Sequence, residues 1–302
     1  MAATKKNIGF IGAGRVGGAL AISLHEAGYP VVAVASRSPE AAAALADHIP
    51  GCQAVTPQEV VDRSEVVFIT TPDAAIRPVC ESLTWRAGMA AVHTSGSESS
   101  ALLEKAAREG AATGSLHPLQ TFADAREART NLPASYFAVE AEGWLRLTLL
   151  EIVAALQGTA IELRPEDKAL YHASATILSN YTVTLAKLAS DLWLRFGWER
   201  PAALRALLPL LKGAVNNVES LGIPLALTGP IARGDVQTVE RHIAALREAA
   251  PDVLPVYREL ALQTIPVALA AGGLSNPAAE ALRMVLEREQ PAGSREGARP
   301  QT

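Results

Sequence analysis

A glycine motif near the start of the chain narrows its fold to few choices. Gly12, Gly14 and Gly17 spell G-x-G-x-x-G between an apolar run at 7–12 and a helix-like segment at 14–27. In that setting the first glycine permits a tight turn and the second lets the backbone approach a pyrophosphate. The third lets the helix pack closely on the strand. The motif and its flanks therefore predict a Rossmann-type domain that binds a dinucleotide.

The predicted helix after the motif begins close to Arg15 and Val16. Free amides at a helix N-terminus, together with the helix dipole, favour phosphate groups. We therefore expect these two residues to hold the phosphates. Ligands of open α/β sheets bind at the carboxyl ends of the strands, which adds four candidate cofactor-binding residues from later strand ends: Thr71, Pro72, Ser95 and Gly96.

The end of the second predicted strand indicates which dinucleotide is bound. NAD-specific domains usually place Asp or Glu there, about 20 residues after the glycine loop, to hold the ribose hydroxyls. This chain has Ser36, Arg37 and Ser38, and no carboxylate before Glu40. A cation and hydroxyls suit a 2′-phosphate, so we expect NADP(H) in preference to NAD(H). The alternative is that Arg37 is an ordinary exposed arginine.

Short β-rich runs alternate with Ala-rich helical segments up to residue 163. Seven such runs are expected to be strands: 7–12, 31–36, 66–71, 89–95, 111–116, 136–140 and 159–163. Their near-continuous apolar character predicts a doubly wound, mostly parallel sheet covered on both faces. Strand signals vanish from Pro165 onward, where helical stretches are separated by Gly and Pro. We expect an α/β Rossmann domain over 1–163, an all-α domain over 164–288 and a disordered tail over 289–302.

Two histidines lie at or just past the ends of apolar strands, where a side chain can face the cofactor cleft. They are His93 and His117. Each could be a hydrogen-bonded structural histidine, and for His117 a catalytic role is equally plausible.

The first long helix of the C-terminal half carries an unusual polar face. At about 100° per residue, Lys168, His172, Ala175 and Ser179 fall within an arc of about 40°, with an apolar face opposite. A polar face usually meets water, and Lys168 could be an ion-paired surface residue. Given the domain order, we expect this face to line the cofactor cleft instead.

The composition excludes several classes of function. The chain has 302 residues, a net charge of −4 and scattered Lys and Arg, which gives nucleic acid or a membrane surface no basic field to bind. Its two cysteines, Cys52 and Cys80, lack metal-ligand spacing, so we expect neither a metal site nor a disulfide scaffold. Without a signal-peptide or membrane-spanning pattern, we expect a cytoplasmic protein.

Four segments together carry a family resemblance: "HTSG", "SLHPLQTF", "DKALYHASATILSNY" and "LTGPIARGD". They resemble an uncharacterised family that joins a Rossmann-like domain to a C-terminal domain of unknown function. More broadly, the order of domains resembles the 6-phosphogluconate dehydrogenase-like and pyrroline-5-carboxylate reductase-like superfamily. The resemblance covers residues 6 to about 288.

The resemblance implies that the long helix borders the nicotinamide. Hydroxyacid dehydrogenases of the superfamily carry Lys-x-x-x-Asn there, with the lysine as proton donor or acceptor; Lys168 matches the lysine, and His172 replaces the asparagine. The replacement puts a hydroxyacid substrate in doubt, because an imidazole can transfer a proton as well as orient a substrate. The resemblance also implies that Thr228 and Gly229 approach the substrate.

We therefore expect an NADP(H)-dependent oxidoreductase that moves hydride to or from a small C=O or C=N compound. Lys168 is the leading acid/base candidate, with His172 and His117 orienting the substrate or sharing the proton. Ser179 and Asn180 would add hydrogen bonds. The Ala- and Leu-rich helices after Pro201 predict a homodimer assembled through the helical domain. The alternative is a nucleotide-binding sensor or scaffold without turnover.

Overall fold

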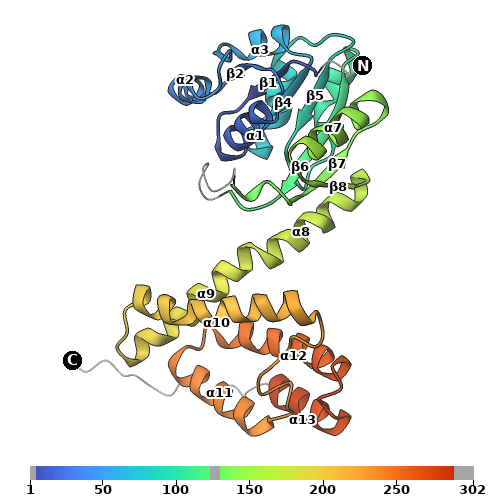
Figure 1. Ribbon diagram of the computed structural model, residues 1–302. Helices are drawn as coiled ribbons and strands as arrows, with labels where there is room; N and C mark the ends of the chain where they lie inside the picture. Colours follow the sequence, from blue (N-terminus) through green and yellow to red (C-terminus); the bar gives the residue numbers. More distant parts are fainter. Residues whose placement is uncertain (1–4, 123–129, 289–302) are drawn as a thin grey trace, which may run out of the picture. The chain divides into compact units, whose positions relative to one another are not determined.

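The computed structural model describes residues 5–122 and 130–288 (Figure 1). The predicted tail, 289–302, lies outside the described residues. The chain divides into two compact units after Asn180. The change from strands to helices falls earlier, between β8 (Thr159–Glu162) and α8 (Lys168–Leu178). The first helix that follows the sheet thus groups with the α/β unit and not with the helices after it.

Within the described residues, eight strands form one sheet in the order β3-β2-β1-β4-β5-β6-β7-β8. All neighbouring strands are parallel except β6 and β7, which are antiparallel. The predicted mostly parallel Rossmann sheet is therefore confirmed. Besides β8, the strands are β1 (Ile8–Ile11), β2 (Val31–Ala35), β3 (Gln53–Ala54), β4 (Val66–Ile69), β5 (Ala90–His93), β6 (Ala112–Leu119) and β7 (Tyr136–Glu140).

Helices cover both faces of this sheet. The helices that contribute to the core on one face are α1 (Arg15–Glu26), α2 (Pro39–Asp47) and α7 (Gly143–Ala155). Those on the other face are α3 (Pro57–Arg63), α4 (Asp73–Ser82), the 3-10 helix η1 (Ser100–Leu103) and α5 (Glu104–Arg108). Two apolar cores result, and together they hold the strands in register.

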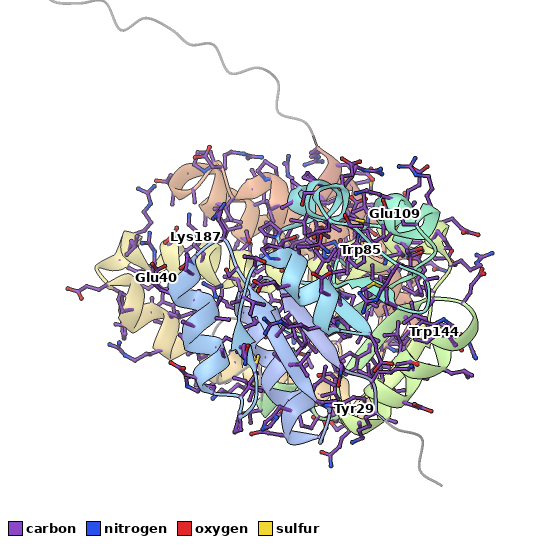
Figure 2. The ribbon with its side chains drawn as sticks, turned by 90° about the horizontal axis from the view of Figure 1, so that it is seen from above. Tyr29, Glu40, Trp85, Glu109, Trp144 and Lys187 are labelled. Carbon is purple, nitrogen blue, oxygen red and sulfur yellow. The ribbon has the colours of Figure 1, made fainter. Side chains whose placement is uncertain are left out.

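Local contacts explain how some of these helices begin. Thr56 and Glu59 form a capping box at the start of α3. The Thr56 hydroxyl accepts from the Glu59 amide, and the Glu59 carboxylate accepts from the Thr56 amide. On the same face of the sheet, Trp85 is buried; its indole N–H donates to the Cys80 carbonyl at 3.0 Å and its amide to Glu109 at 2.6 Å (Figure 2). This contact closes the turn between α4 and β5.

All the secondary-structure elements in the described residues of the second unit are helices, as the sequence predicts. It contains α9 (Asn180–Trp193) from Tyr181 onward, η3 (Leu194–Phe196), α10 (Arg200–Leu221), α11 (Val236–Ala249), α12 (Leu254–Ala270) and α13 (Asn276–Glu287). Helices α11, α12 and α13 enclose a core that includes Val239, Ile265 and Leu282. Asp235 caps α11 by accepting from the Thr238 amide at 3.0 Å. None of the described helices has the length and apolar content needed to span a bilayer.

Candidate active site

The glycine loop joins β1 to α1 in the predicted way. Gly12 has φ of +119°, a backbone conformation that side chains rarely adopt, and a Cβ there would lie 2.7 Å from the Thr70 backbone. A Cβ on Gly17 would lie 2.2 Å from the Gly12 carbonyl oxygen. In contrast, a Cβ on Gly14 would meet nothing within 4 Å. Gly12 and Gly17 therefore serve close backbone packing, and Gly14 faces open space.

A cavity of about 520 Å³ opens beside this loop, and we call it the glycine-loop cavity. Among its lining residues are the predicted cofactor contacts Gly12, Gly14, Ser36, Arg37, Ser38, Thr71 and Pro72. The Thr71 hydroxyl is buried and has no hydrogen-bond partner in the described protein. A buried hydroxyl without a partner is costly unless a ligand binds it. The open space at Gly14 and the free Thr71 hydroxyl fit a bound dinucleotide.

Two of the predicted 2′-phosphate contacts differ in their surroundings. Arg37 is exposed and lines the cavity. The Ser38 hydroxyl instead caps α2, where it accepts from the Ala41 amide and donates to Glu40 at 2.7 Å. Ser38 is thus already hydrogen-bonded within the protein, because it directly precedes Pro39 at the start of the helix.

The candidate catalytic residues lie on one face of the sheet, and we call this part of the site the chemical side. The register pairs His93 with Ser115 and Ser115 with Glu140 across three neighbouring strands. Because side chains alternate along a strand, His117 shares its face with Ser115. The sequence places His117 at or just past the end of its strand. In the structure β6 continues through His117 and pairs it with Ala138, so this histidine lies inside the strand. The antiparallel partner β7 extends β6 in this way.

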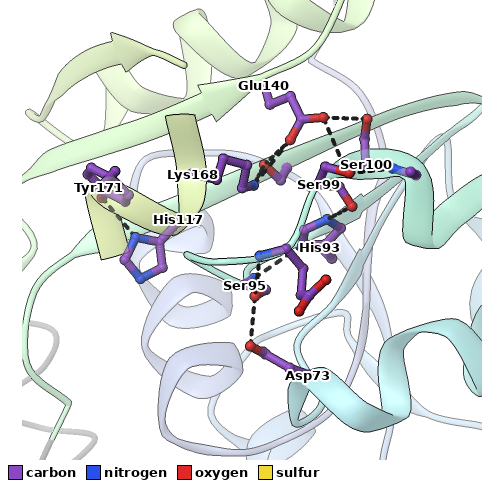
Figure 3. Close-up of polar contacts among 12 residues, drawn as sticks. Asp73, His93, Ser95, Ser99, Ser100, His117, Glu140, Lys168 and Tyr171 are labelled. Carbon is purple, nitrogen blue, oxygen red and sulfur yellow. Dashed lines mark hydrogen bonds and ion pairs between the residues drawn. The ribbon is translucent and has the colours of Figure 1, made fainter. Parts of the chain in front are cut away.

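Lys168 is buried beneath the start of α8, with 1% of its surface exposed. Its amine donates to the Ser115 hydroxyl at 2.5 Å and pairs with the Glu140 carboxylate at 3.2 Å (Figure 3). Glu140 also accepts from the amide and hydroxyl of Ser100, at 2.9 and 2.6 Å. This buried polar cluster fastens α8 to the sheet. The alternative of Lys168 as an ion-paired surface residue is excluded.

Burial and pairing shift the ionisation of this pair. Burial lowers the pKa of Lys168 below its ordinary value, although the Glu140 carboxylate opposes the shift. Burial tends to raise the pKa of Glu140, but the Ser100 hydrogen bonds and the Lys168 amine outweigh it and lower that pKa. Glu140 is therefore a carboxylate at neutral pH, placed against a lysine that loses its proton more readily than usual.

His93 is fully buried and has both ring nitrogens bonded. Its Nδ1 accepts from the Ser95 amide at 3.2 Å, and its Nε2 lies 3.1 Å from the Ser99 carbonyl oxygen. Burial, helped by the Lys168 charge, lowers the pKa of His93 to about 4. These contacts fit the structural role considered for this histidine, because they tie residues 95–99 to the end of β5.

His117 and His172 converge on Gly96. A Cβ on Gly96 would lie 2.8 Å from Nε2 of His117 and 2.6 Å from Cδ2 of His172. These three residues help to line a second cavity of about 160 Å³, which we call the histidine cavity. Its other lining residues are Val16, Asp73, Thr94, Ser95, Pro118, Gln120 and Phe122.

The two cavities are built partly from the same stretches of chain. Residues 12–14 line the glycine-loop cavity and Val16 lines the histidine cavity. Likewise, residues 70–72 line the first and Asp73 the second. Asp73 accepts from the Ser95 hydroxyl at 2.8 Å, which holds the loop after β5 against the start of α4. Two predicted cofactor contacts, Ser95 and Gly96, therefore lie on the histidine side.

The sequence predicts that Lys168, His172 and Ser179 line one cleft. Only His172 lines the histidine cavity, because the Lys168 amine is bonded to Ser115 and Glu140. Ser179 follows α8 as its C-cap, and Asn180 begins α9. Neither residue is among those that line the histidine cavity.

Other predicted residues lie elsewhere. Arg15 is exposed in the first turn of α1. Thr228 and Gly229 belong to the second compact unit, and their approach to substrate stays a prediction.

In α8 the polar face is buried and the apolar face is exposed, which is the reverse of an ordinary amphipathic helix. Lys168 is buried and His172 is half-buried, whereas Leu170 is 79% exposed and Ile177 is 61% exposed. The polar face meets the sheet and the apolar face is open in the single chain.

The sequence did not single out several residues of this cluster. Tyr171 lies 2.9 Å from Nδ1 of His117, and Glu140 with Ser100 holds Lys168. Glu140 offered no usable signal, because β7 runs antiparallel to β6 and its carboxyl end is not among the parallel strand ends where ligands bind. Tyr171 had none either, because its contact spans 54 residues of sequence.

Comparison with domain families agrees with this geometry. Residues 7–95 match the family described as NADP oxidoreductase, coenzyme F420-dependent. Residues 135–264 match a domain of unknown function, DUF2520. The two matches cover separate parts of the chain, and the first of them is to a family of NADP oxidoreductases. The resemblance found in the sequence is confirmed, and the second family begins at β7, so it includes both Glu140 and α8.

Solved structures show the same fold. Protein TM1727 from Thermotoga maritima is 27% identical, with a TM-score of 0.71 over 87% of this chain and 98% of that one. A Bacteroides fragilis protein provisionally described as an NADP oxidoreductase is 24% identical, with a TM-score of 0.70 over the same shares. A reductive aminase from Aspergillus terreus, in complex with NADPH and ethyl levulinate, is 19% identical, with a TM-score of 0.62 over 92% and 99% of the two chains. No curated protein matches the chain.

Proposed function

We propose that the protein reduces a small C=O or C=N compound with NADPH, or oxidises the corresponding product with NADP⁺, and that this compound binds in the histidine cavity. The observation that carries the proposal is the convergence of His117 and His172 on Gly96. This convergence occurs in a cavity that shares its supporting loops with the glycine-loop cavity. A volume of about 160 Å³ suits a small substrate.

The bound cofactor would supply the hydride, and the protein would supply position and a proton. His172 would give the proton to the oxygen or nitrogen of the substrate, with His117 as the second contact. Lys168 would act as a positioning residue, since its amine already bonds to Ser115 and Glu140. Asp73 would orient the loop that carries Ser95 and Gly96.

A substrate screen at fixed NADPH tests this proposal. The panel should hold cyclic imines, small ketones, aldehydes and amine–ketone pairs, with NADPH oxidation followed by absorbance. We expect at least one C=O or C=N class to give steady oxidation and a reduced product by mass spectrometry. NADPH binding without oxidation by any member would favour the sensor alternative.

The preference for NADP(H) rests on Arg37, which is exposed at the rim of the glycine-loop cavity. A guanidinium can pair with a 2′-phosphate through two hydrogen bonds. The Glu40 carboxylate accepts a hydrogen bond from the Ser38 hydroxyl. We therefore propose that Arg37 contacts the phosphate, while Ser38 keeps α2 capped.

We also propose that the protein is a homodimer assembled through its helical unit. A groove of about 300 Å³ between α9 and α10 is lined mainly by Leu and Ala side chains, including Leu204, Leu207 and Leu211. Leu210, which also lines this groove, is 72% exposed. Apolar surface of this extent in one region marks an interface, and an identical copy offers the same surface in return.

Sedimentation of full-length protein tests the dimer against the chain mass of 31.7 kDa. We expect twice that mass at micromolar concentration, and a shift towards the single-chain mass in Leu210→Glu. The matched control is Leu147→Glu, which adds the same charge at an exposed leucine of α7 in the other unit. A wild-type protein of single-chain mass would contradict the proposal.

A further inference from the structure

The two ring nitrogens of His117 have different surroundings. Nδ1 lies 2.9 Å from the Tyr171 hydroxyl oxygen (Figure 3). Nε2 and Cε1 are turned to Gly96, since a Cβ there would lie 2.8 and 2.9 Å from them. Both His117 and Gly96 line the histidine cavity. One nitrogen is thus engaged by a phenol and the other is on the cavity side.

Burial keeps both partners of this contact uncharged near neutral pH. Burial, with the charges of His172 and Lys168, lowers the pKa of His117 to about 4, against a smaller opposing effect of Asp73. Burial raises the pKa of Tyr171 to about 12. The imidazole therefore carries one N–H, and the phenol keeps its hydrogen.

A neutral imidazole can place its hydrogen on either nitrogen, and the contact with Tyr171 discriminates between them. A phenol is a stronger donor than a neutral imidazole N–H, and an imidazole nitrogen is a stronger acceptor than a phenolic oxygen. The bond is therefore best formed with Tyr171 donating to Nδ1, which leaves the hydrogen on Nε2. His93 shows the same arrangement, because its Nδ1 accepts from the Ser95 amide.

We propose that Tyr171 is a positioning residue that donates to Nδ1 of His117 and thereby presents an Nε2–H donor to the histidine cavity. The ligand class this donor recognises is a neutral hydrogen-bond acceptor, the oxygen of a carbonyl or the nitrogen of an imine. This role deepens the proposed function and rests on it. His117 then polarises the acceptor atom without giving up its hydrogen, and the transferred proton comes from His172.

The packing of α8 supports this role. Tyr171 and His172 are neighbours on the helix, and both meet the His117 ring edge-on, with centroids 5.6 and 5.9 Å away. Lys168, one turn earlier, fastens the helix to Ser115 and Glu140. The hydrogen bond from Tyr171 is therefore held in place by a buried anchor.

Nitrogen NMR of the full-length protein determines which tautomer His117 adopts, and the measurement needs no enzymatic turnover. Long-range ¹H–¹⁵N spectra at neutral pH distinguish a protonated Nε2 from a protonated Nδ1, and His117→Gln assigns the signals. We expect His117 to be neutral with hydrogen on Nε2, and Tyr171→Phe to move its nitrogen shifts towards a mixture of tautomers. Tyr181→Phe, at an exposed tyrosine, should leave the shifts unchanged.

A wild-type His117 with hydrogen on Nδ1 would overturn the inference, even if NADPH oxidation were found. The inference also fails if Tyr171→Phe folds normally by circular dichroism and keeps the wild-type His117 spectrum. A failed substrate screen, in contrast, would remove the proposed function and leave the tautomer result to stand. Once a substrate is known, we expect Tyr171→Phe to lower kcat by at least about tenfold with NADPH affinity within about twofold.

Discussion

The two sides of the site are built by different means. On the cofactor side, the glycine loop uses backbone atoms and open space, and its key residues lie within six positions of one another. On the chemical side, Lys168 reaches Ser115 across 53 residues and Tyr171 reaches His117 across 54. The first side depends on local backbone geometry, and the second depends on buried, charge-sensitive contacts between distant segments.

This difference predicts how each side fails. A substitution that fills space next to the glycine-loop backbone should impair cofactor binding and leave the histidine cavity unchanged. A change of charge or pH should damage the chemical side first, since buried ionisable groups are stabilised only by specific partners.

The largest effect is expected from removing one partner of the buried ion pair. Lys168→Met leaves the Glu140 carboxylate buried with only hydroxyl and amide donors, which should lower the free energy of unfolding by about 3–5 kcal/mol. Urea unfolding measures the change. The double variant Lys168→Met with Glu140→Leu should recover much of the loss, and an equally unstable double variant would show that packing, not charge, holds α8.

Acid should weaken the chemical side. His93 and His117 have folded-state pKa values of about 4, below the ordinary 6.5, so the unfolded chain binds more protons between these values. Stability should therefore fall as pH drops through this window, by up to about 1.4 kcal/mol per pH unit for each histidine. The lowered pKa of Glu140 acts in the same direction below pH 4.5. The urea midpoint should depend less steeply on pH in His117→Gln than in the wild type. An unchanged pH dependence would contradict the lowered pKa of His117.

A pair of glycine variants separates backbone packing from cofactor space. Gly17→Ala puts a Cβ 2.2 Å from the Gly12 carbonyl oxygen, so it should lower stability by about 1–3 kcal/mol and impair NADPH binding. Gly14→Ala meets no protein atom within 4 Å and should lower NADPH affinity with a stability change below about 1 kcal/mol. Thermal unfolding and cofactor titration measure both. Equal stability losses in the two variants would be inconsistent with the described loop.

The smallest expected effect is on the choice of cofactor. Arg37→Asp removes the cation and adds the carboxylate that holds ribose hydroxyls, so the preference for NADPH over NADH should reverse, with each affinity changing by about tenfold. Titration with both cofactors measures it, and Arg195→Asp in the other unit is the charge control. A wild-type protein that binds both cofactors equally would remove the role of Arg37.

The sequence predicted the local geometry of the glycine loop, because that geometry depends on neighbouring residues. Gly12, Gly14 and Gly17 stand between a strand and a helix as the motif requires, and the observed strand order brings Thr71 and Pro72 to the same cavity. The helical periodicity also identified Lys168 and His172 as members of one face.

The chemical side was predicted only in part. Periodicity says which residues share a face and not what that face meets, so Lys168 was expected in an open cleft and lies instead against Glu140 and Ser115. The exposed apolar face of α8 could not be foreseen either, because an amphipathic pattern alone assigns the apolar face to the core. Tyr171 was missed because its partner lies on a distant strand.

Steady-state kinetics of two histidine variants test the central claim, that the histidine cavity is where the substrate reacts. With any substrate that the screen identifies, His117→Gln and His172→Gln should each lower kcat/KM by at least about a hundredfold, while NADPH affinity stays within about twofold of wild type. The matched control is His48→Gln, at an exposed histidine that follows α2. Full turnover in both cavity variants would contradict the account and place the chemistry outside the histidine cavity.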